Sequence, residues 1–298
     1  MSQLSSPPRG LIPLGGKPRA RDYLRGLWAR RQFAVNLATG QLRGEHMDTV
    51  LGSLWRLINP ILLIAIYYLI FGIIFDVGGA AVEDADLAGD VRPPNYIAFL
   101  TVGVMFYGYM QRTISGGASS IVNNVGLLRS LQFPRAILPL SVAIKEAAGF
   151  WPSFLVILAT MLLTGEGLFW GMLAFPVVFV MATLFNLGGA MITARLTDTV
   201  RDMRNVLPFV FRLGFYLSGV LYDIGRFTQG RPNWQWLEPV FLLNPFYVFI
   251  SLAREYLMHS HAHFDLRLLW LSAVLWTLLA LAGGFFFFTA AEKRYGRG

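Results

Sequence analysis

Long apolar stretches separated by short polar segments dominate the chain. A helix needs about 20 predominantly apolar residues to cross the hydrocarbon core of a bilayer, which is roughly 30 Å thick. Residues 268–290 are the clearest case, because the run LLWLSAVLWTLLALAGGFFFF contains no charged side chain. The pattern predicts an all-α integral membrane protein with six transmembrane helices, at residues 57–75, 96–116, 137–163, 168–193, 205–224 and 268–290.

The third stretch begins with polar interruptions. It contains Pro139, Lys145 and Glu146, so its membrane part is expected to begin near Ala147. Charged groups at membrane depth are functional candidates by default, but snorkelling to the nearer interface also accounts for these two. Adjacent helix positions point about 100° apart. We therefore expect Lys145 and Glu146 not to pair with each other.

The region before the first span divides into a tail and an amphipathic helix. Residues 1–18 are rich in Pro, Gly and Ser and lack the apolar core of a signal peptide, which predicts a flexible tail. Residues 19–50 predict a basic helix lying in the plane of the cytoplasmic interface. Its apolar side chains fall within an arc of about 100°, and they are Leu24, Leu27, Trp28, Val35, Ala38 and Leu42.

The segment at 225–267 is too aromatic for a hydrophilic loop, yet no clean span emerges from it. The run WLEPVFLLNPFYVFISLARE is apolar but is broken by Pro239 and Pro245. Broken backbone at membrane depth is tolerated only where protein or a water-filled cavity satisfies it. We therefore expect a re-entrant pair of short helices between the fifth and sixth spans.

Composition supports the membrane assignment. The 298 residues are 55% hydrophobic and 14% charged, whereas soluble domains carry roughly 25% charged residues. Cysteine is absent, which excludes disulfides and thiolate metal sites. The net charge of +8 is typical either of nucleic-acid binding or of the cytoplasmic face of a membrane protein.

The distribution of the charges favours the membrane explanation. Up to Arg56 the chain has nine Lys or Arg and three acids, and Lys293, Arg294 and Arg297 lie near the other end. Loop 76–94 instead has five acids and one Arg. By the positive-inside rule both termini are expected in the cytoplasm. Two cytoplasmic termini require an even number of spans. The expected location is the plasma (inner) membrane. No nucleic-acid partner is needed to explain the basic charge.

Two short motifs have residue types that occur in chemical sites. The run GLIPLGGKP at 10–18 has the wrong spacing for a phosphate-binding loop and no preceding strand, so the chain is not expected to hydrolyse ATP or to be an enzyme. His259, His261 and His263 would face one side only in an extended segment. A polar turn before the last span explains them better than a metal site.

Four motifs resemble those of ABC-2 type exporter permeases, in the same order around six spans. They are LGSLWRLINP (51–60), FPRAILPLS (133–141), RDMRNVLPFVFRLGFYLSGVLYDI (201–224) and LLNPFYVFISLARE (242–255). The closing EKRYG (292–296) is also similar, and the family's Pro near the end of the fifth span is replaced in SGVLY (218–222). The resemblance covers residues 20–296, and the chain looks most like the polysaccharide-exporting branch, in particular the actinobacterial exporter of lipid-linked cell-wall galactan.

The resemblance implies partners. Such permeases act as two copies together with two separate ATPase subunits, which would bind the ATP and Mg that this chain lacks. It implies an ATPase contact on the interface helix and on a coupling segment at 119–135. Apolar residues spaced by three make a short amphipathic helix there. The coupling residues are Val122, Val125, Leu128, Arg129, Leu131, Phe133 and Arg135.

The resemblance also implies a sugar path along the first and fifth spans. Aromatic rings stack on the C–H faces of sugar rings, although aromatic residues in spans also pack against lipid and helices. The candidate path residues are Trp55, Tyr67, Tyr68, Phe71, Phe75, Phe209, Phe215, Tyr216 and Tyr222. The planar guanidinium of arginine suits a lipid pyrophosphate, and the candidates, which the positive-inside bias also explains, are Arg195, Arg201 and Arg204.

Two other functions are compatible with the sequence. One is a drug or small-lipid exporter of the same superfamily. The other is a membrane-embedded polyprenyl-phosphate glycosyltransferase, which would need acidic residues holding a divalent cation; the acids of 76–94 are expected on the outer side. Small-residue runs at 188–190 and 283–284 permit close helix packing, without showing whether it occurs within one chain or between two.

Overall fold

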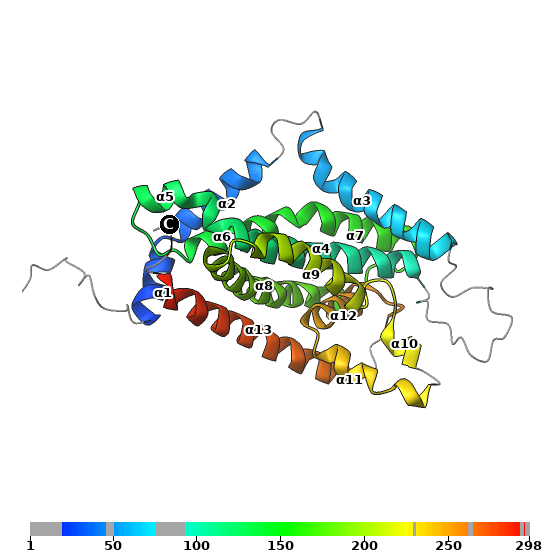
Figure 1. Ribbon diagram of the computed structural model, residues 1–298. Coiled ribbons are helices and arrows are strands. Elements are labelled where there is room, and N and C mark those ends of the chain that lie inside the picture. Colours follow the sequence, from blue (N-terminus) through cyan, green and yellow to red (C-terminus); the bar gives the residue numbers. More distant parts are fainter. Residues whose placement is uncertain are drawn as a thin grey trace, which may run out of the picture.

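The computed structural model describes residues 20–45, 51–74, 93, 95–228, 231–261, 265–292 and 295. Over these residues the chain contains helices and no strand, and the longest helices run along one bundle (Figure 1). The predicted tail 1–18, most of the predicted outer loop 76–94, and Phe75 lie outside the described residues.

The elements follow one another with short connections. Those labelled η are 3-10 turns, except η2, which is π-helical. They are α1 (Ala20–Ala29), α2 (Arg31–Gly44), η1 (Gly52–Leu54), α3 (Trp55–Tyr67), η2 (Tyr68–Ile74), α4 (Tyr96–Ser120), η3 (Val122–Asn124), α5 (Val125–Ser130), α6 (Ile137–Gly149), α7 (Trp151–Leu163), η4 (Trp170–Ala174), α8 (Phe175–Thr199), α9 (Met203–Leu217), α10 (Ile224–Thr228), η5 (Pro232–Trp234), α11 (Leu237–Leu242), α12 (Pro245–Leu257) and α13 (Leu266–Ala290).

The centre of the bundle is α4. Its residues are buried along most of its length, and α3, α6, α7, α8, α9 and α12 pack against it. A Cβ at Gly117 would collide with the backbone of Ala190 on α8, so this glycine allows the two helices to meet. Gly188 and Gly284 allow the same contact between α8 and α13. These small residues therefore pack within one chain.

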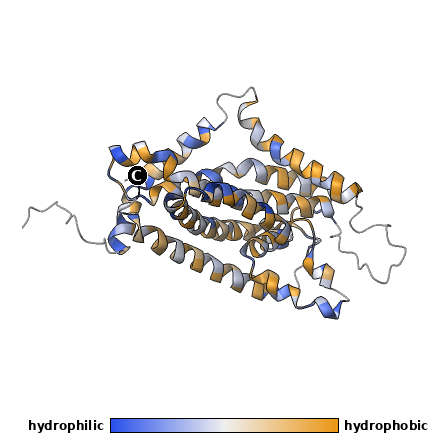
Figure 2. Cartoon of the chain, in the orientation of Figure 1, coloured by the Kyte–Doolittle hydropathy of each residue, from blue (hydrophilic) through white to orange (hydrophobic). Residues whose placement is uncertain are grey.

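Four of the predicted spans are confirmed as long apolar helices. The segments that can cross a membrane by length and composition are Leu57–Ile74, Ile137–Leu163, Trp170–Thr199 and Leu266–Ala290. Hydrophobic residues follow α3 and α13, while α1 and α2 carry more hydrophilic ones (Figure 2). The protein is thus a multi-pass membrane protein.

The two remaining predicted spans are helices that do not meet the same test within the described residues. The predicted span 96–116 corresponds to α4, which is long enough at 25 residues. Its sequence is less apolar because neighbouring helices, rather than lipid, surround it. The predicted span 205–224 corresponds to α9, which has 15 residues. Its length of about 22 Å is shorter than the roughly 30 Å thickness of the hydrocarbon core.

Other predicted elements are interrupted. The helix expected at 19–50 is two helices separated at Arg30, because α1 packs at the end of α13 whereas α2 packs along α6. The third span is divided at Phe150, where α6 ends and α7 begins. In the aromatic segment, Pro232–Leu242 and Pro245–Leu257 meet at 97°, the geometry of either a broken span or a re-entrant loop.

Candidate transport path and coupling surface

Three distant segments meet where α1 reaches the end of α13. The Glu292 carboxylate accepts hydrogen bonds from the Tyr23 hydroxyl (3.0 Å) and from the backbone N–H of Arg135 (2.9 Å). The Tyr23 oxygen accepts from the N–H of Ala136 (3.1 Å), and the Arg135 guanidinium donates to the Glu292 carbonyl oxygen. Tyr23, Arg135, Ala136 and Glu292 are called the Glu292 cluster below.

Burial keeps the tyrosine of this cluster protonated. It raises the pKa of Tyr23 above its ordinary value, and the negative charge of Glu292 raises this pKa further. Tyr23 can therefore donate to the carboxylate at any physiological pH. The cluster links the FPR and EKRYG motifs to the first described helix, a connection that the sequence did not reveal.

The predicted coupling segment forms a shorter helix than its spacing suggested. It consists of η3 and α5, and the chain is no longer helical at 131–134. Leu128 and Phe133 pack against an apolar cluster around Tyr23 and Phe288. Of the predicted coupling residues, Val122, Arg129 and Leu131 are exposed, Val125 is half-buried, and Arg135 belongs to the Glu292 cluster.

The predicted interface residues divide between two surroundings. Leu27 packs against the same apolar cluster, and Ala38 is buried. Leu24, Trp28 and Val35 are exposed, and Trp28 has 71% of its surface accessible. The apolar arc is therefore packed in the bundle at some positions and exposed at others.

The first and fifth predicted spans do meet through aromatic rings. Tyr67 at the end of α3 stacks on Phe215 of α9, with ring centroids 5.2 Å apart and planes inclined by 23°. Phe71 lies beside Tyr67 at 6.2 Å, and Tyr216 beside Phe215 at 5.5 Å. Tyr222 adds a hydrogen bond from its hydroxyl to the carbonyl of Tyr216 (2.8 Å).

The other candidate path residues are more scattered. Phe209 is 70% exposed on α9. Trp55 is half-buried at the beginning of α3, and the half-buried ring of Tyr68 covers Gly72. Only the Tyr67–Phe215 group forms a continuous aromatic contact between α3 and α9 among these described residues.

Sequence reasoning missed two rings that complete this group. The Tyr107 ring of α4 meets Phe215 edge-on at 5.3 Å and lies 5.3 Å from Phe246 of α12. Its hydroxyl donates to the carbonyl of Phe211 (2.5 Å). The run MFYGYM contains Tyr107, but the resemblance places the path along the first and fifth spans alone.

At the end of the bundle opposite the Glu292 cluster, Arg254 is buried and its guanidinium donates hydrogen bonds to backbone carbonyls. It donates to Gly219 (2.8 Å), Val220 (2.8 Å) and Phe99 (3.2 and 3.3 Å), and it lies 3.2 Å from the centroid of the Phe99 ring. Asn244 binds the same turn through the Leu217 carbonyl (3.0 Å) and the Ser218 hydroxyl (3.1 Å). We call Phe99, Gly219, Val220 and Arg254 the Arg254 cluster.

This geometry gives the Asn, Pro and Arg of the NP…R motif separate structural roles. Asn244 caps α12 by accepting from the N–H of Phe246 (3.0 Å), and Pro245 occupies the first helical position. Arg254, in the last turn, faces the turn at Gly219, where φ is +62°. The motif therefore holds the chain where α9 ends.

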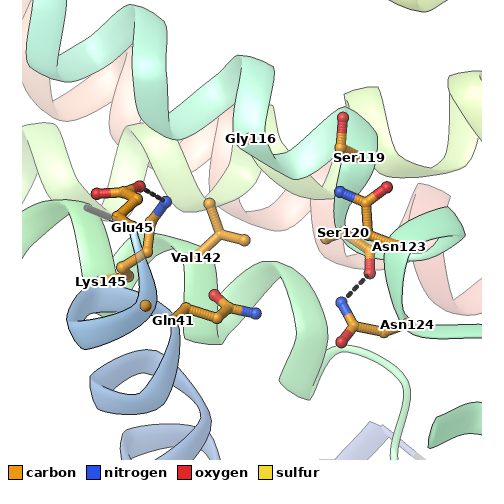
Figure 3. Close-up of a pocket in the computed structure, with 10 residues that line it drawn as sticks. Gln41, Glu45, Gly116, Ser119, Ser120, Asn123, Asn124, Val142 and Lys145 are labelled. Atoms are coloured by element: carbon orange, nitrogen blue, oxygen red, sulfur yellow. Dashed lines mark hydrogen bonds and ion pairs between the residues drawn. The ribbon is translucent and has the colours of Figure 1, made fainter. Parts of the chain in front are cut away.

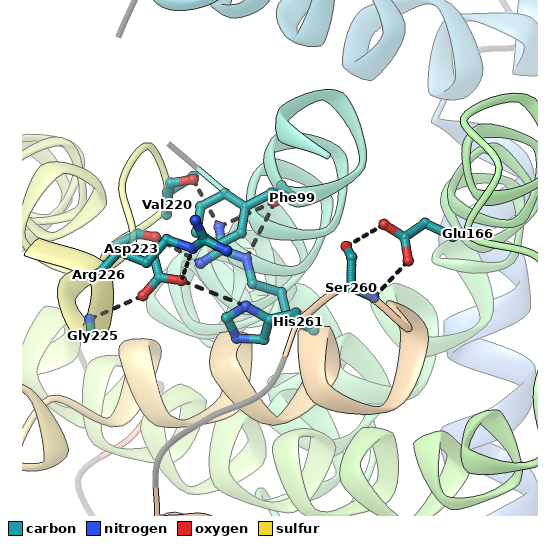
Figure 4. A network of polar contacts seen from close by, with 10 residues as sticks. Phe99, Glu166, Val220, Asp223, Gly225, Arg226, Ser260 and His261 are labelled. Carbon is teal, nitrogen blue, oxygen red and sulfur yellow. Dashed lines mark hydrogen bonds and ion pairs between the residues drawn. The ribbon is translucent and has the colours of Figure 1, made fainter. Parts of the chain in front are cut away.

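Polar contacts continue outward from this cluster (Figure 4). Asp223 lies 3.6 Å from Nδ1 of His261 and 3.9 Å from Nε of Arg226. Ser260 donates its N–H (2.9 Å) and its hydroxyl to Glu166. Partial burial opposes ionisation of Glu166, but these hydrogen bonds outweigh it and lower the pKa of the carboxyl group.

The two described histidines of the tract contact neighbouring elements of the bundle. Among the described residues, no group of three or more His, Asp or Glu side chains is arranged to hold a metal ion. His261 contacts Asp223 and the Phe99 ring, and His259 meets Phe169 at 5.6 Å. His263 lies outside the described residues.

One prediction from helical geometry is wrong. Lys145 Nζ lies 2.8 Å from a carboxylate oxygen of Glu146, and it also binds Glu45 (2.7 Å), the residue that follows α2. Glu146 in turn lies 3.3 Å from Nε of Arg112 on α4. The long lysine side chain spans the 100° between neighbouring positions. Glu45 holds Lys145 in place, and Arg112 holds Glu146.

The three pyrophosphate candidates lie near one another in sequence but differ in surroundings. Arg195 donates to the Phe287 carbonyl and stacks over the Phe287 ring at 3.9 Å, so it is engaged with α13. Arg201 and Arg204 are exposed where α9 begins. The last two are thus more accessible to an anionic ligand than Arg195.

Comparison with known proteins identifies the family. The sequence profile described as ABC-2 type transporter matches residues 46–258. An O-antigen export system permease protein RfbA of Myxococcus xanthus is 27% identical over 201 residues, covering 67% of this chain and 72% of the relative. Its namesake in Klebsiella pneumoniae is 24% identical over 253 residues, covering 83% and 89%. The chain belongs to the ABC-2 type transporter family.

Proposed function

We propose that this chain is the membrane-spanning subunit of an ATP-driven exporter that moves a lipid-linked polysaccharide out of the cytoplasm. The observation that carries the proposal is the aromatic contact of Tyr67 with Phe215, continued by Tyr107. Flat apolar faces on two neighbouring helices suit sugar rings, and the similar proteins are named as O-antigen export permeases.

In this proposal the chain has six spans. Crossing by α4 is compatible with its composition because other helices surround it. The short α9 is extended by the turn at 218–223, whose carbonyls at Gly219 and Val220 accept from Arg254. Non-helical backbone is tolerated at membrane depth when protein satisfies it in this way.

The orientation follows from charge. The end of the bundle with the Glu292 cluster lies in the cytoplasm, since it is richer in Lys and Arg. The absence of cysteine permits a direct test with single cysteines at the exposed positions Ser130 and Asn233. A membrane-impermeant maleimide added to intact cells is expected to label Asn233→Cys and not Ser130→Cys; the reverse pattern contradicts the orientation.

The proposed partners are two copies of a separate ATPase subunit and a second copy of this chain. The exposed Trp28 on α1 and Leu131 after α5 form apolar positions for the ATPase contact. The exposed residues of α3 and α9, among them Leu62 and Val210, supply a surface for the second copy. ATP and Mg bind the partner in this scheme.

The test is purification from the native membrane in mild detergent, followed by an ATPase assay in proteoliposomes. We expect an ATP-binding subunit in equal amount and hydrolysis that increases with lipid-linked glycan. Lipid-linked galactan is the first substrate to test, and a short O-antigen glycan is the comparison. A chain that purifies alone and transfers sugar by itself would contradict the proposal, as would hydrolysis stimulated only by drugs or small lipids.

A further inference from the structure

A polar pocket lies between the end of α2, the end of α4 and the middle of α6. Its volume of about 480 Å³ falls within the range of about 300–1,000 Å³ that is typical of small-molecule sites. Gln41, Ser119 and Asn123 line it together with Glu45, Lys145 and Val142 (Figure 3). Among the described lining residues Val142 is the one with a sizeable apolar side chain.

The pocket continues a polar face of the central helix. Gly116 and Ser119 follow Arg112 on α4 at spacings of four and three, and Asn123 in η3 comes four residues later. A Cβ on Gly116 would come within 2.8 Å of a Val142 methyl group, so the glycine allows α4 and α6 to approach at the pocket floor. The rest of α4 faces other helices.

The charges around the pocket compensate one another. Lys145 is held by Glu45 (2.7 Å) and Glu146 (2.8 Å), and Arg112 binds Glu146 (3.3 Å). Two cations thus face two carboxylates, which leaves little net charge to attract a phosphate. The remaining lining groups are amides and hydroxyls, which both donate and accept hydrogen bonds.

We propose that this pocket binds a sugar unit of the glycan, through hydroxyl groups, at the cytoplasmic end of the transporter. Neutral hydroxyl-rich rings match its mixed donors and acceptors better than an anion or an apolar molecule would. The inference rests on the proposed polysaccharide export. It adds a polar sugar site that is separate from the aromatic residues of α3 and α9.

The position of the pocket connects it to the coupling segment. Asn123 and Asn124 belong to η3, which leads directly into α5, and Asn124 donates to the Ser120 carbonyl (2.8 Å) at the end of α4. A sugar bound here contacts α2, α4 and η3 together. The presence of substrate is thereby registered next to the proposed ATPase contact.

Two glycines of α2 provide a matched pair of variants. A Cβ at Gly44, which lines the pocket, meets no atom within 4 Å, and the same is true of Gly40, which does not line it. Gly44→Phe therefore places a ring at the wall of the pocket without a clash, and Gly40→Phe adds the same ring to the same helix elsewhere. A third variant, Ser119→Ala with Asn123→Ala, removes polar groups without adding volume.

The experiment measures binding of a soluble galactose disaccharide to the full chain with its co-purified partners in nanodiscs, by saturation-transfer NMR. We expect Gly44→Phe to weaken binding about tenfold or more, equivalent to about 1.4 kcal/mol, and the double alanine variant to weaken it less. Gly40→Phe is expected to bind like the unmodified protein. Unchanged binding in Gly44→Phe, or no binding by the unmodified protein, overturns the sugar site.

Two further readouts separate the alternatives. If inorganic pyrophosphate, and not the disaccharide, occupies the pocket when both are offered, the pocket is a phosphate site. That result would overturn the proposal. Release of the ATPase subunit by Gly44→Phe, with disaccharide binding intact, would make it a protein contact and do the same. Export of lipid-linked glycan by the unmodified protein without disaccharide binding removes the pocket alone, whereas no glycan export removes the proposed function as well.

Discussion

The two ends of the bundle are held by polar clusters of opposite kinds. The Arg254 cluster joins a fully buried cation to neutral carbonyls and an aromatic face. The Glu292 cluster joins a carboxylate to a hydroxyl and a backbone N–H at the rim of the bundle. The comparison suggests that the first end is built to keep one conformation, and that the second leaves its carboxylate partly accessible to water or a partner.

The largest expected effect comes from removing the buried cation. Arg254→Met leaves the Gly219 and Val220 carbonyls without their donor, at a cost of about 1–3 kcal/mol for each unsatisfied group. We expect a lower thermal unfolding midpoint in detergent, with Arg254→Lys in between because an ammonium cannot reproduce the fork. Arg267→Met, at an exposed arginine of α13, is the control. Equal midpoints would show that Arg254 does not hold this end.

A smaller change, the addition of one methyl group, tests the packing of the backbone at the Arg254 end. A Cβ at Gly103 would meet the Arg254 guanidinium and come within 3.0 Å of the Val220 carbonyl oxygen, so Gly103→Ala should push the turn away. At Gly283 a Cβ meets nothing within 4 Å, and Gly283→Ala should be neutral or stabilising by up to about 1 kcal/mol. Similar thermal midpoints for the two variants would contradict the tight packing of this cluster.

A substitution at the Glu292 end is expected to uncouple ATP hydrolysis from export before it lowers the stability of the fold. Leu131 is 50% exposed beyond α5, so Leu131→Glu should leave insertion intact while ATP hydrolysis no longer drives export. Leu128→Glu is a less clean test, because Leu128 also packs on the apolar cluster. Leu168→Glu, at an exposed leucine of the other end, is the control. Normal export by Leu131→Glu would refute the coupling role.

A milder change addresses the Glu292 cluster itself. Tyr23→Phe removes the donor to Glu292 and leaves the buried N–H of Ala136 without its acceptor, which costs about 1–3 kcal/mol. We expect faster amide hydrogen exchange at residues 135–138, with exchange around Arg254 unchanged. Faster exchange at both ends would mean that the two clusters are not independent.

The smallest effect is a pH dependence near the Arg254 end. The pKa of Glu166 is lower in the folded protein than in the unfolded chain, so its contribution to stability is complete above the unfolded pKa of about 4.3. It is lost as pH falls through the lowered pKa. The link from Glu166 to Ser260 should therefore loosen in acid, seen as a loss of amide-exchange protection at Ser260 relative to an unstructured peptide at the same pH, and Glu166→Gln should remove this dependence. An equal loss of protection in Glu166→Gln would assign the change to another group.

Hydropathy predicted the spans best where lipid sets the composition. The four confirmed spans correspond to long apolar helices. The prediction was less successful for α4, which neighbouring helices cover, and for α9, which ends in the clamped turn at Gly219. Local spacing also failed for Lys145 and Glu146, because Glu45 and Arg112 decide where those side chains point.

The sequence by itself determined that the chain is a helical membrane protein and which motifs it shares with ABC-2 exporters, because apolar length and residue order are local properties. Tertiary structure decided which motifs meet. Arg254 reaches Phe99 across 155 residues, and Tyr23 reaches Glu292 across 269. Such contacts depend on how helices pack around α4, where glycines such as Gly117 set the distance between backbones, and spacing along one helix does not reveal that packing.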